Sequence, residues 1–215
     1  LEKLVKPKRV VPATVEIVDI AGLVKGASKG EGLGNQFLAN IRETDAILHV
    51  VRCFDDPNIV HVDGSVDPVR DKEIIDTELQ IKDLETIENR IKKVEKQAQT
   101  TNDKDAKRLY SILLRFKEVL LQGKSARVVT FDNAEDEKLA KGLFLLTNKP
   151  VMYVCNVDEA SAATGNEHVE RLKAAIADEG AEVLVIAAKI ESEIAELDSY
   201  EERQMFLEEI GLKQS

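Results

Sequence analysis

The sequence predicts an α/β protein with a mostly parallel sheet that is interrupted by an inserted antiparallel helical hairpin. Short β-branched runs alternate with helix-like stretches from residue 10 to about residue 70, and the same rhythm returns from residue 149. Between them the apolar residues change to helical spacing. Because the two outer parts are too short to be separate domains, we expect them to share one sheet. The predicted units are 1–72, 73–146 and 147–215.

The first unit reads as strand, loop, helix and strand. Residues 15–18 (VEIV) and 46–51 (AILHVV) are rich in β-branched and apolar residues, which predicts two strands. Phe37, Leu38 and Ile41 form an apolar stripe at helical spacing between them. A strand, a helix and a second strand in this order form a βαβ unit, which predicts parallel pairing.

Two amphipathic helices are expected in the middle unit. Apolar residues repeat at spacings of three and four on both sides of a polar break at 100–103, which predicts an antiparallel hairpin with a coiled-coil seam. The seam residues are Leu84, Ile87, Ile91, Val94 and Ala98, then Ala106, Leu109, Leu113, Phe116 and Leu120. Asn102 is the expected N-cap of the second helix and Gly123 its end. A shorter helix is expected over about 134–146.

The last unit returns to alternating strands and helices. Residues 151–155 and 183–186 are predicted strands, and residues 169–178 and 200–210 are predicted helices.

Composition excludes several classes of protein. The net charge of -10 argues against indiscriminate coating of nucleic acid, and no apolar run approaches the roughly 20 residues of a membrane helix. Two cysteines outside any Cys-x-x-Cys spacing make a disulfide framework or a zinc site improbable and fit a reducing cytoplasm. The chain begins at Leu1 without Met or a signal sequence, so we expect a piece of a longer protein.

The first candidate site is the D-x-x-G sequence Asp19–Gly22 that follows the first predicted strand. In nucleotide-binding α/β proteins, an Asp at this strand end reaches Mg²⁺ through a water, and the Gly N–H meets the γ-phosphate. The alternative is an Asp that only caps a loop.

A glycine-rich loop continues from this sequence. Five of the eleven glycines of the chain, together with Lys25, Ser28 and Lys29, fall between residues 22 and 34. Such a loop could close around phosphates once a ligand binds. A flexible linker is the alternative.

A second candidate site follows the predicted strand 151–155. Guanine-reading proteins place Asn-Lys-x-Asp at such a strand end, whereas this chain has Asn156, Val157 and Glu159 in the first, second and fourth positions. Glu is one methylene longer than Asp and the Lys stem is missing, which favours an adenine or relaxed purine site. The alternative is a polar turn that starts a helix.

Two further segments have sequences that suggest contact with a nucleotide, but these sequences are less specific. Ala188 and Lys189 follow the last predicted strand, where main-chain N–H groups could contact the base from its other side. Gly123-Lys124-Ser125 imitates the end of a phosphate loop, but position 118, where the first Gly belongs, is a Glu. We therefore interpret this segment as a helix end.

The hairpin tip is basic in an otherwise acidic chain. Residues 90–108 hold seven basic and three acidic residues, which suits ribosomal RNA or an acidic partner. The alternative is a solvated helical face with i,i+4 pairs. The basic residues are Arg90, Lys92, Lys93, Lys96, Lys104, Lys107 and Arg108.

The run VDIAGLVKGASKGEGLGN over residues 18–35 resembles the hallmark of the YchF/Obg-like ATPase family, and the segments VRCF (51–54) and NVDE (156–159) and the inserted hairpin agree with it. The resemblance covers essentially the whole chain. It implies a P-loop NTPase with a Ras-like G-domain core, which prefers ATP to GTP, uses Mg²⁺ and associates with the ribosome, through the large subunit. Members also carry an N-terminal phosphate loop and a C-terminal TGS domain, neither of which occurs in these residues.

The resemblance also implies roles for single residues. Asp19 would hold Mg²⁺ through water and Gly22 would contact the γ-phosphate. Asn156, Val157 and Glu159 would surround the adenine, with Ala188 and Lys189 on its other side.

The residue that orients the attacking water is the open question of the catalytic site. Ras-like enzymes follow D-x-x-G with a Gln, whereas this chain has Leu23. His61, in a polar loop, is a candidate to orient that water or accept its proton, with a solvated loop histidine as the alternative.

These observations lead to one expected function and two alternatives. We expect a Mg²⁺-dependent, ATP-preferring P-loop NTPase that acts as a translation-linked switch, inactive without its phosphate loop. A GTPase with a tolerant base pocket and a ribosome-binding scaffold with a regulatory nucleotide site are the alternatives.

Overall fold

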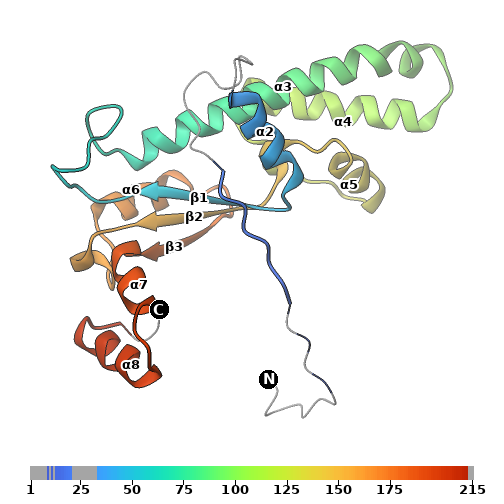
Figure 1. Ribbon diagram of the computed structural model, residues 1–215. Helices are drawn as coiled ribbons and strands as arrows, with labels where there is room; N and C mark the ends of the chain where they lie inside the picture. The colour runs from blue at the N-terminus through green and yellow to red at the C-terminus, as the bar shows by residue number, and fades with distance from the viewer. Residues whose placement is uncertain (1–8, 10, 12, 21–32, 213–215) are drawn as a thin grey trace.

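The computed structural model describes residues 9, 11, 13–20 and 33–212 of the chain. A three-stranded parallel sheet lies at its centre, with the order β1 (Ile47–Arg52), β2 (Val151–Asn156) and β3 (Glu182–Ile186) (Figure 1). The helices are α2 (Leu33–Glu43), α3 (Pro68–Thr100), α4 (Lys104–Leu121), α5 (Ala134–Lys141), α6 (Glu167–Ala175), α7 (Ala188–Ala195) and α8 (Tyr200–Glu209), and short 3-10 helices are η2 (Ala126–Val128), η3 (Leu146–Asn148) and η4 (Glu159–Ser161).

The sheet confirms that the two outer units of the chain come together. Strand β1 pairs with β2 over six residues, from Ile47 opposite Val151 to Arg52 opposite Asn156. The pairing is parallel because the connection between the strands crosses the sheet by way of the helical insertion. Residues about one hundred positions apart therefore share one sheet.

The two faces of this sheet differ in burial. On one face Val51, Tyr153 and Cys155 are buried against α6, α7 and α8. On the other face Leu48 is 52% exposed and Val50 is 65% exposed. Because successive strand residues point to opposite faces, the alternation along β1 separates a packed layer from an open one.

The predicted strand over residues 15–18 is wrong. These residues form no regular strand, and Val15 and Ile17 are 81% and 75% exposed. A strand needs a neighbour for its main-chain hydrogen bonds, and among the described residues none pairs with this segment. Figure 1 shows the segment, in dark blue, running away from the sheet.

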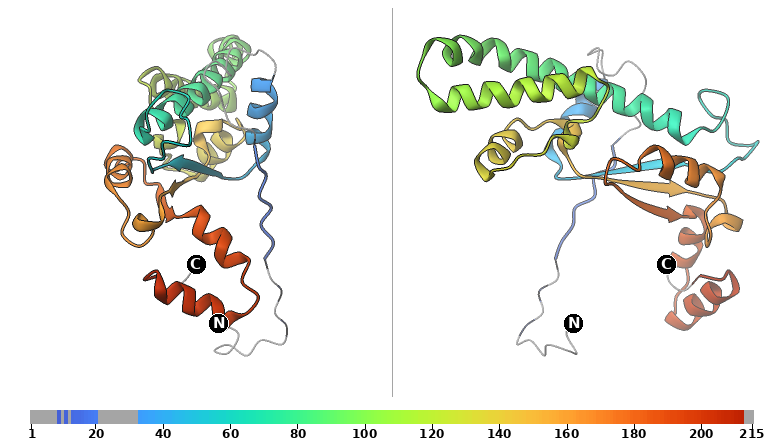
Figure 2. Two further views of the ribbon diagram at one scale, coloured as in Figure 1. Left: turned by 60° about the vertical axis from the view of Figure 1, so that its left-hand side comes forward. Right: turned by 180° about the vertical axis from the view of Figure 1, so that it is seen from behind.

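The predicted hairpin is confirmed, and it is longer than expected. Helices α3 and α4 pack along each other and project beyond the sheet (Figure 2). Buried Ile87, Leu113 and Phe116 lie in its core, with Ile91 and Leu109 packed against them. Helix α3 begins at Pro68, so one continuous helix covers the sheet and also enters the hairpin.

Several helix ends differ from expectation, and one helix was not expected. The N-cap of α4 is Asp103 and not Asn102, because the Asp103 carboxylate accepts hydrogen bonds from the next helical N–H groups at 3.0 and 3.1 Å. The helix expected over 134–146 ends at Lys141, where Gly142 follows. Helix α7 was not expected. Gly123 follows the end of α4 with a φ of +70°, which confirms it as a helix end.

A buried ion cluster fixes the base of the hairpin on the sheet. Lys72 of α3 contacts Asp76 at 2.6 Å and Glu179 at 2.5 Å. The Glu179 carboxylate also accepts from Arg127 at 3.2 Å and from the Tyr153 hydroxyl at 2.9 Å. Both ends of the helical insertion are thus tied to β2 and to the turn before β3.

The return from the hairpin to the sheet is held by one buried carboxylate. Asp83 of α3 is fully buried and accepts from the main-chain N–H groups of Leu146 and Thr147 at 2.8 and 2.7 Å, and from the Thr147 hydroxyl at 2.7 Å. Burial raises the pKa of Asp83, and these three hydrogen bonds oppose that shift. The segment entering β2 is therefore anchored to the middle of α3.

Within the described residues, no helix combines the length and the apolarity that crossing a membrane requires.

Candidate nucleotide-binding site

The structure brings together two of the predicted base-contacting segments. Asn156 ends β2, and Ala188 begins α7 directly after β3. The Asn156 Oδ1 atom accepts a hydrogen bond from the Ala188 N–H at 3.0 Å. In open parallel sheets, ligands bind in the crevice at the carboxyl ends of the strands, which is where this contact lies.

Three polar groups near this contact have no partner among the described residues. Asn156 uses its carbonyl on Ala188, so its amide N–H₂ group is left without a partner among the described residues. Glu159 and Lys189 are exposed, and neither makes an ion pair within the described part of the chain. An amide donor, a carboxylate acceptor and an exposed cation are groups that could meet a nucleotide.

Val157 and Asp158 take structural roles at the same corner. The Val157 side chain is 4% exposed and packs in the core of the sheet, and its N–H donates to the Ile186 carbonyl at 2.8 Å. Only the main chain of Val157 can therefore face a base. The Asp158 carboxylate caps η4 by accepting a hydrogen bond from the Ser161 N–H at 2.9 Å. Asp158 therefore fits the alternative of a polar turn that starts a helix.

The predicted magnesium and phosphate groups lie on the N-terminal segment. Asp19 is exposed and makes no hydrogen bond or ion pair with other described residues. Its free carboxylate has the chemistry that Mg²⁺ prefers. Gly22, Leu23 and the predicted phosphate-contacting residues of the glycine-rich loop lie outside the described residues.

His61 lies in the loop between β1 and α3 and has partners on both ring nitrogens. Its Nε2 atom lies 2.9 Å from the Asp71 carboxylate, and its Nδ1 atom accepts from the Asp63 N–H at 3.2 Å. A water could bind this ring only after one of these bonds opens. The ligand atoms of His61, Asp63 and Asp71 lie within 4.8 Å of one another, but the Arg70 guanidinium contacts both carboxylates and supplies a positive charge.

Arg52 organises the same loop and was missed in the sequence. Its guanidinium donates to the main-chain carbonyls of Phe54, Ile59 and Asp56 at 3.0, 3.0 and 3.4 Å. It also lies 4.7 Å from the centre of the Phe54 ring. The only signal in the sequence is an Arg at the end of an apolar strand. The loop lines an open pocket of about 400 Å³ beside the carboxyl end of β1.

The cations of the hairpin fall into two groups. Arg108 pairs with Glu135 and with Asp136, the latter at 3.0 Å, and Lys107 donates to Asn102 at 3.3 Å. Lys92 interacts electrostatically with the Glu88 carboxylate, which Lys117 contacts at 2.9 Å. The others have no carboxylate partner among the described residues; these are Arg90, Lys93, Lys96 and Lys104. The paired residues therefore fit the expected alternative of a solvated helical face, and the rest leave positive charge unneutralised.

A parallel sheet with helices packed on it, together with a D-x-x-G sequence near the N-terminus, is typical of the P-loop NTPase fold. Residues 4–90 match the family described as 50S ribosome-binding GTPase. Over the whole chain the sequence is 54% identical to the Ribosome-binding ATPase YchF of Bacillus subtilis and 48% identical, over 214 residues, to that of Escherichia coli O157:H7. The chain belongs to the YchF family, as the run over residues 18–35 indicates.

A solved structure supports the same assignment of the fold. The structure of the Schizosaccharomyces pombe YchF GTPase superimposes with a TM-score of 0.81 at 33% sequence identity and covers 99% of this chain. The chain spans 58% of the length of that protein and of the two bacterial relatives.

Proposed function

We propose that this chain is the nucleotide-binding part of a ribosome-associated P-loop NTPase that hydrolyses ATP in preference to GTP. The observation that carries the proposal is the hydrogen bond between Asn156 and Ala188, which joins the carboxyl ends of β2 and β3. We propose this corner as the base-binding corner. The names of the relatives, ribosome-binding ATPase and YchF GTPase, support both the hydrolysis and the ribosome. Such a function places the protein in the cytoplasm.

The base preference rests on Glu159 and on the missing Lys. In guanine-reading sites a carboxylate accepts from two adjacent N–H groups of the base, whereas adenine offers one amino group beside a ring acceptor. Glu159 is a methylene longer than the Asp of that pattern, and Val157 turns its side chain into the core. We infer that this corner accepts adenine better than guanine.

The phosphate end of the site is assigned to the N-terminal segment. When bound, Mg²⁺ neutralises charge on the β- and γ-phosphates. We infer that Asp19 holds a water of that ion and that the Gly22 N–H donates to the γ-phosphate. The 215 residues contain no G-x-x-x-x-G-K-[ST] sequence, so we expect them alone to bind nucleotide weakly and not to hydrolyse it.

His61 is the residue proposed to orient the attacking water, since Leu23 cannot. Its Nδ1 atom becomes available if the bond from the Asp63 N–H opens, while Asp71 continues to hold the ring. Unchanged turnover of His61→Ala in the protein with its phosphate loop would remove this role.

The ribosome contact is assigned to the unpaired cations of the hairpin, and the large subunit is the proposed partner because the matching family is described as 50S ribosome-binding. A scaffold whose hairpin binds regardless of nucleotide is the second candidate, favoured by a hairpin with its own core. Ribosome binding that is equal with ATP, with ADP and without nucleotide would identify the scaffold.

Parallel titrations with ATP and GTP test the base preference. The protein carries an added N-terminal phosphate loop, and Mg²⁺ is present. We expect ATP to bind more tightly, and Glu159→Asp to narrow or reverse the difference by bringing the carboxylate closer to the guanine pattern. Glu170→Asp, on the exposed face of α6, is the matched control and should change neither affinity. Tighter GTP binding by the unaltered protein would instead identify a GTPase with relaxed base specificity.

A further inference from the structure

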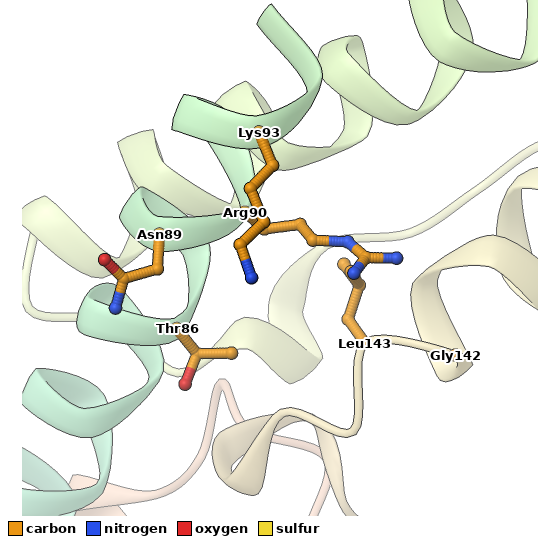
Figure 3. Close-up of a pocket in the computed structure, with 6 residues that line it drawn as sticks. All are labelled: Thr86, Asn89, Arg90, Lys93, Gly142 and Leu143. Carbon is orange, nitrogen blue, oxygen red and sulfur yellow. The ribbon is translucent and has the colours of Figure 1, made fainter.

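A groove lies on the side of the hairpin, between α3 and the segment that follows α5. It has a volume of about 310 Å³ and is lined by Thr86, Asn89, Arg90, Lys93, Gly142 and Leu143. Figure 3 shows the Lys93 ammonium and the Arg90 guanidinium reaching over this hollow from one face of α3, with Leu143 opposite them. Two cations thus converge on one recess.

The positive charge of this groove is not neutralised by neighbouring residues. None of its lining residues carries a carboxylate, and neither Arg90 nor Lys93 makes an ion pair with any described residue. The acidic residues nearest in sequence have other partners. Glu88 contacts Lys117 at 2.9 Å, and Glu95 accepts hydrogen bonds from the Tyr110 hydroxyl at 3.1 Å and from the Gln99 amide at 3.3 Å. A positive recess in a chain with a net charge of -10 favours an anionic ligand.

The spacing of the donors suits an extended anion. Residues 86, 89, 90 and 93 share one helical face, and Lys96 continues that face by a further rise of about 4.5 Å for three residues. Thr86 already donates its hydroxyl to the Lys82 carbonyl at 3.0 Å, so Asn89, Arg90 and Lys93 are the donors that remain. The row runs from the groove toward the hairpin tip, which fits a chain of phosphates better than one small anion.

We propose that this groove binds the phosphodiester backbone of RNA, with Arg90 and Lys93 each neutralising a phosphate. The inference rests on the proposed ribosome association, because the ribosome offers RNA phosphates as its main anionic surface. RNA is favoured over an acidic protein because an Arg fork and an Asn amide provide directed donors for phosphate oxygens. The lining holds no aromatic side chain, so recognition is of the backbone and independent of base sequence.

Binding of a 12-nucleotide oligouridine by the 215-residue chain, measured over a range of salt concentrations, tests the groove. Arg90→Gln combined with Lys93→Gln should weaken binding at least about tenfold at low salt. It should also reduce the slope of log affinity against log salt by about 1.4, since each phosphate neutralised on a single strand contributes about 0.7. Both residues are exposed, so the variant should fold normally, which its thermal unfolding checks.

Lys82→Gln combined with Lys173→Gln is the matched control, because it removes the same charge from cations that already have carboxylate partners. An equal loss in the control, or unchanged binding in the groove variant, overturns the proposal. So does a 12-residue polyglutamate that binds as tightly with the same dependence on Arg90 and Lys93, which would indicate an acidic protein partner. Saturable binding of inorganic phosphate without oligouridine binding would indicate a small-anion site and overturns it as well.

Ribosome co-sedimentation of the protein with its phosphate loop separates this proposal from the proposed function. If the unaltered protein co-sediments and the groove variant does so equally, the groove is not the contact and the function stands. If the unaltered protein does not co-sediment, the proposed ribosome association fails, and the oligouridine measurement still decides whether the groove binds RNA.

Discussion

The helical hairpin forms as predicted and the strand predicted over residues 15–18 does not, although both predictions came from the pattern of apolar residues. The hairpin forms two helices around a core that includes Ile87, Leu113 and Phe116, all nearly or fully buried. The segment over residues 15–18 forms no strand, and the side chains of Val15, Ile17 and Val18 remain exposed.

The difference lies in where the main-chain hydrogen bonds go. A helix satisfies its N–H and C=O groups within its own segment, and two amphipathic helices need only each other to bury their apolar faces. A strand depends on a neighbour in the sheet for every main-chain bond. β1 has that neighbour in β2, whereas residues 15–18 have none among the described residues.

The largest loss of stability is expected for a substitution in the core of the hairpin, which tests whether the hairpin depends on that core. Phe116 is fully buried and its ring meets that of Phe131 at 5.8 Å between centroids. Phe116→Ala should lower the free energy of unfolding by about 3–5 kcal/mol in a urea titration, because it leaves a large cavity. Leu121→Ala, at a side chain that is 62% exposed on the same helix, should change it by less than about 0.5 kcal/mol. If Phe116→Ala lowers the free energy of unfolding by less than about 1 kcal/mol, the apolar seam is not what stabilises the hairpin.

A smaller loss of stability should distinguish the buried face of the sheet from the exposed face. Val51 is 3% exposed and the adjacent Val50 is 65% exposed. Val51→Thr buries a hydroxyl among apolar groups and should cost about 2 kcal/mol, whereas Val50→Thr should cost less than about 0.5 kcal/mol. Equal costs in the same urea titration would mean that the outer face is also packed in solution.

The smallest loss of stability is expected at the start of α3, where the hairpin meets the sheet. Asp67 caps this helix: the Arg70 N–H, with smaller contributions from Arg171 and the Val69 N–H, holds the pKa of its carboxyl below the usual range. Asp67→Ala should lower the free energy of unfolding by about 1 kcal/mol at pH 7.

The difference in the free energy of unfolding between the unaltered protein and Asp67→Ala should depend on pH in one direction. A carboxyl with a lowered pKa in the folded state stabilises the protein above its unfolded pKa, and that contribution is lost as the pH falls through the folded pKa. The gap between the unaltered protein and Asp67→Ala should therefore shrink as the pH falls from 7 to about 3. A gap that is constant over this range would contradict the role of the charge.

The corner proposed to bind the base was only partly predictable from the sequence. Asn156 and Ala188 follow strands that the pattern identifies, and parallel strands end at one edge, so their proximity was foreseeable. That Val157 points into the core and that Asp158, rather than Glu159, caps the next turn depended on how the chain leaves β2. The role of Arg52 depended on three carbonyls of a loop whose path has no periodic signal.

The hairpin cations illustrate the same limit in electrostatic terms. Arg108 and Arg90 are equivalent in the sequence, as basic residues near a polar tip. In the structure Arg108 is paired with Glu135 and Asp136, which come from α5, while Arg90 lies unpaired over a groove. Charge counting identifies a basic region, but only packing between distant segments decides which of its charges remain available.

The sequence by itself determined the α/β class, the hairpin with its seam, and the YchF-family run over residues 18–35. These features depend on local periodicity and on contiguous motifs, which do not require distant partners. The tertiary structure decided which strand-like run joins the sheet, which face of the sheet is covered, and which polar groups have partners. Those outcomes follow from hydrogen bonds and ion pairs between residues far apart in the chain, such as Asp83 with Thr147 and Lys72 with Glu179.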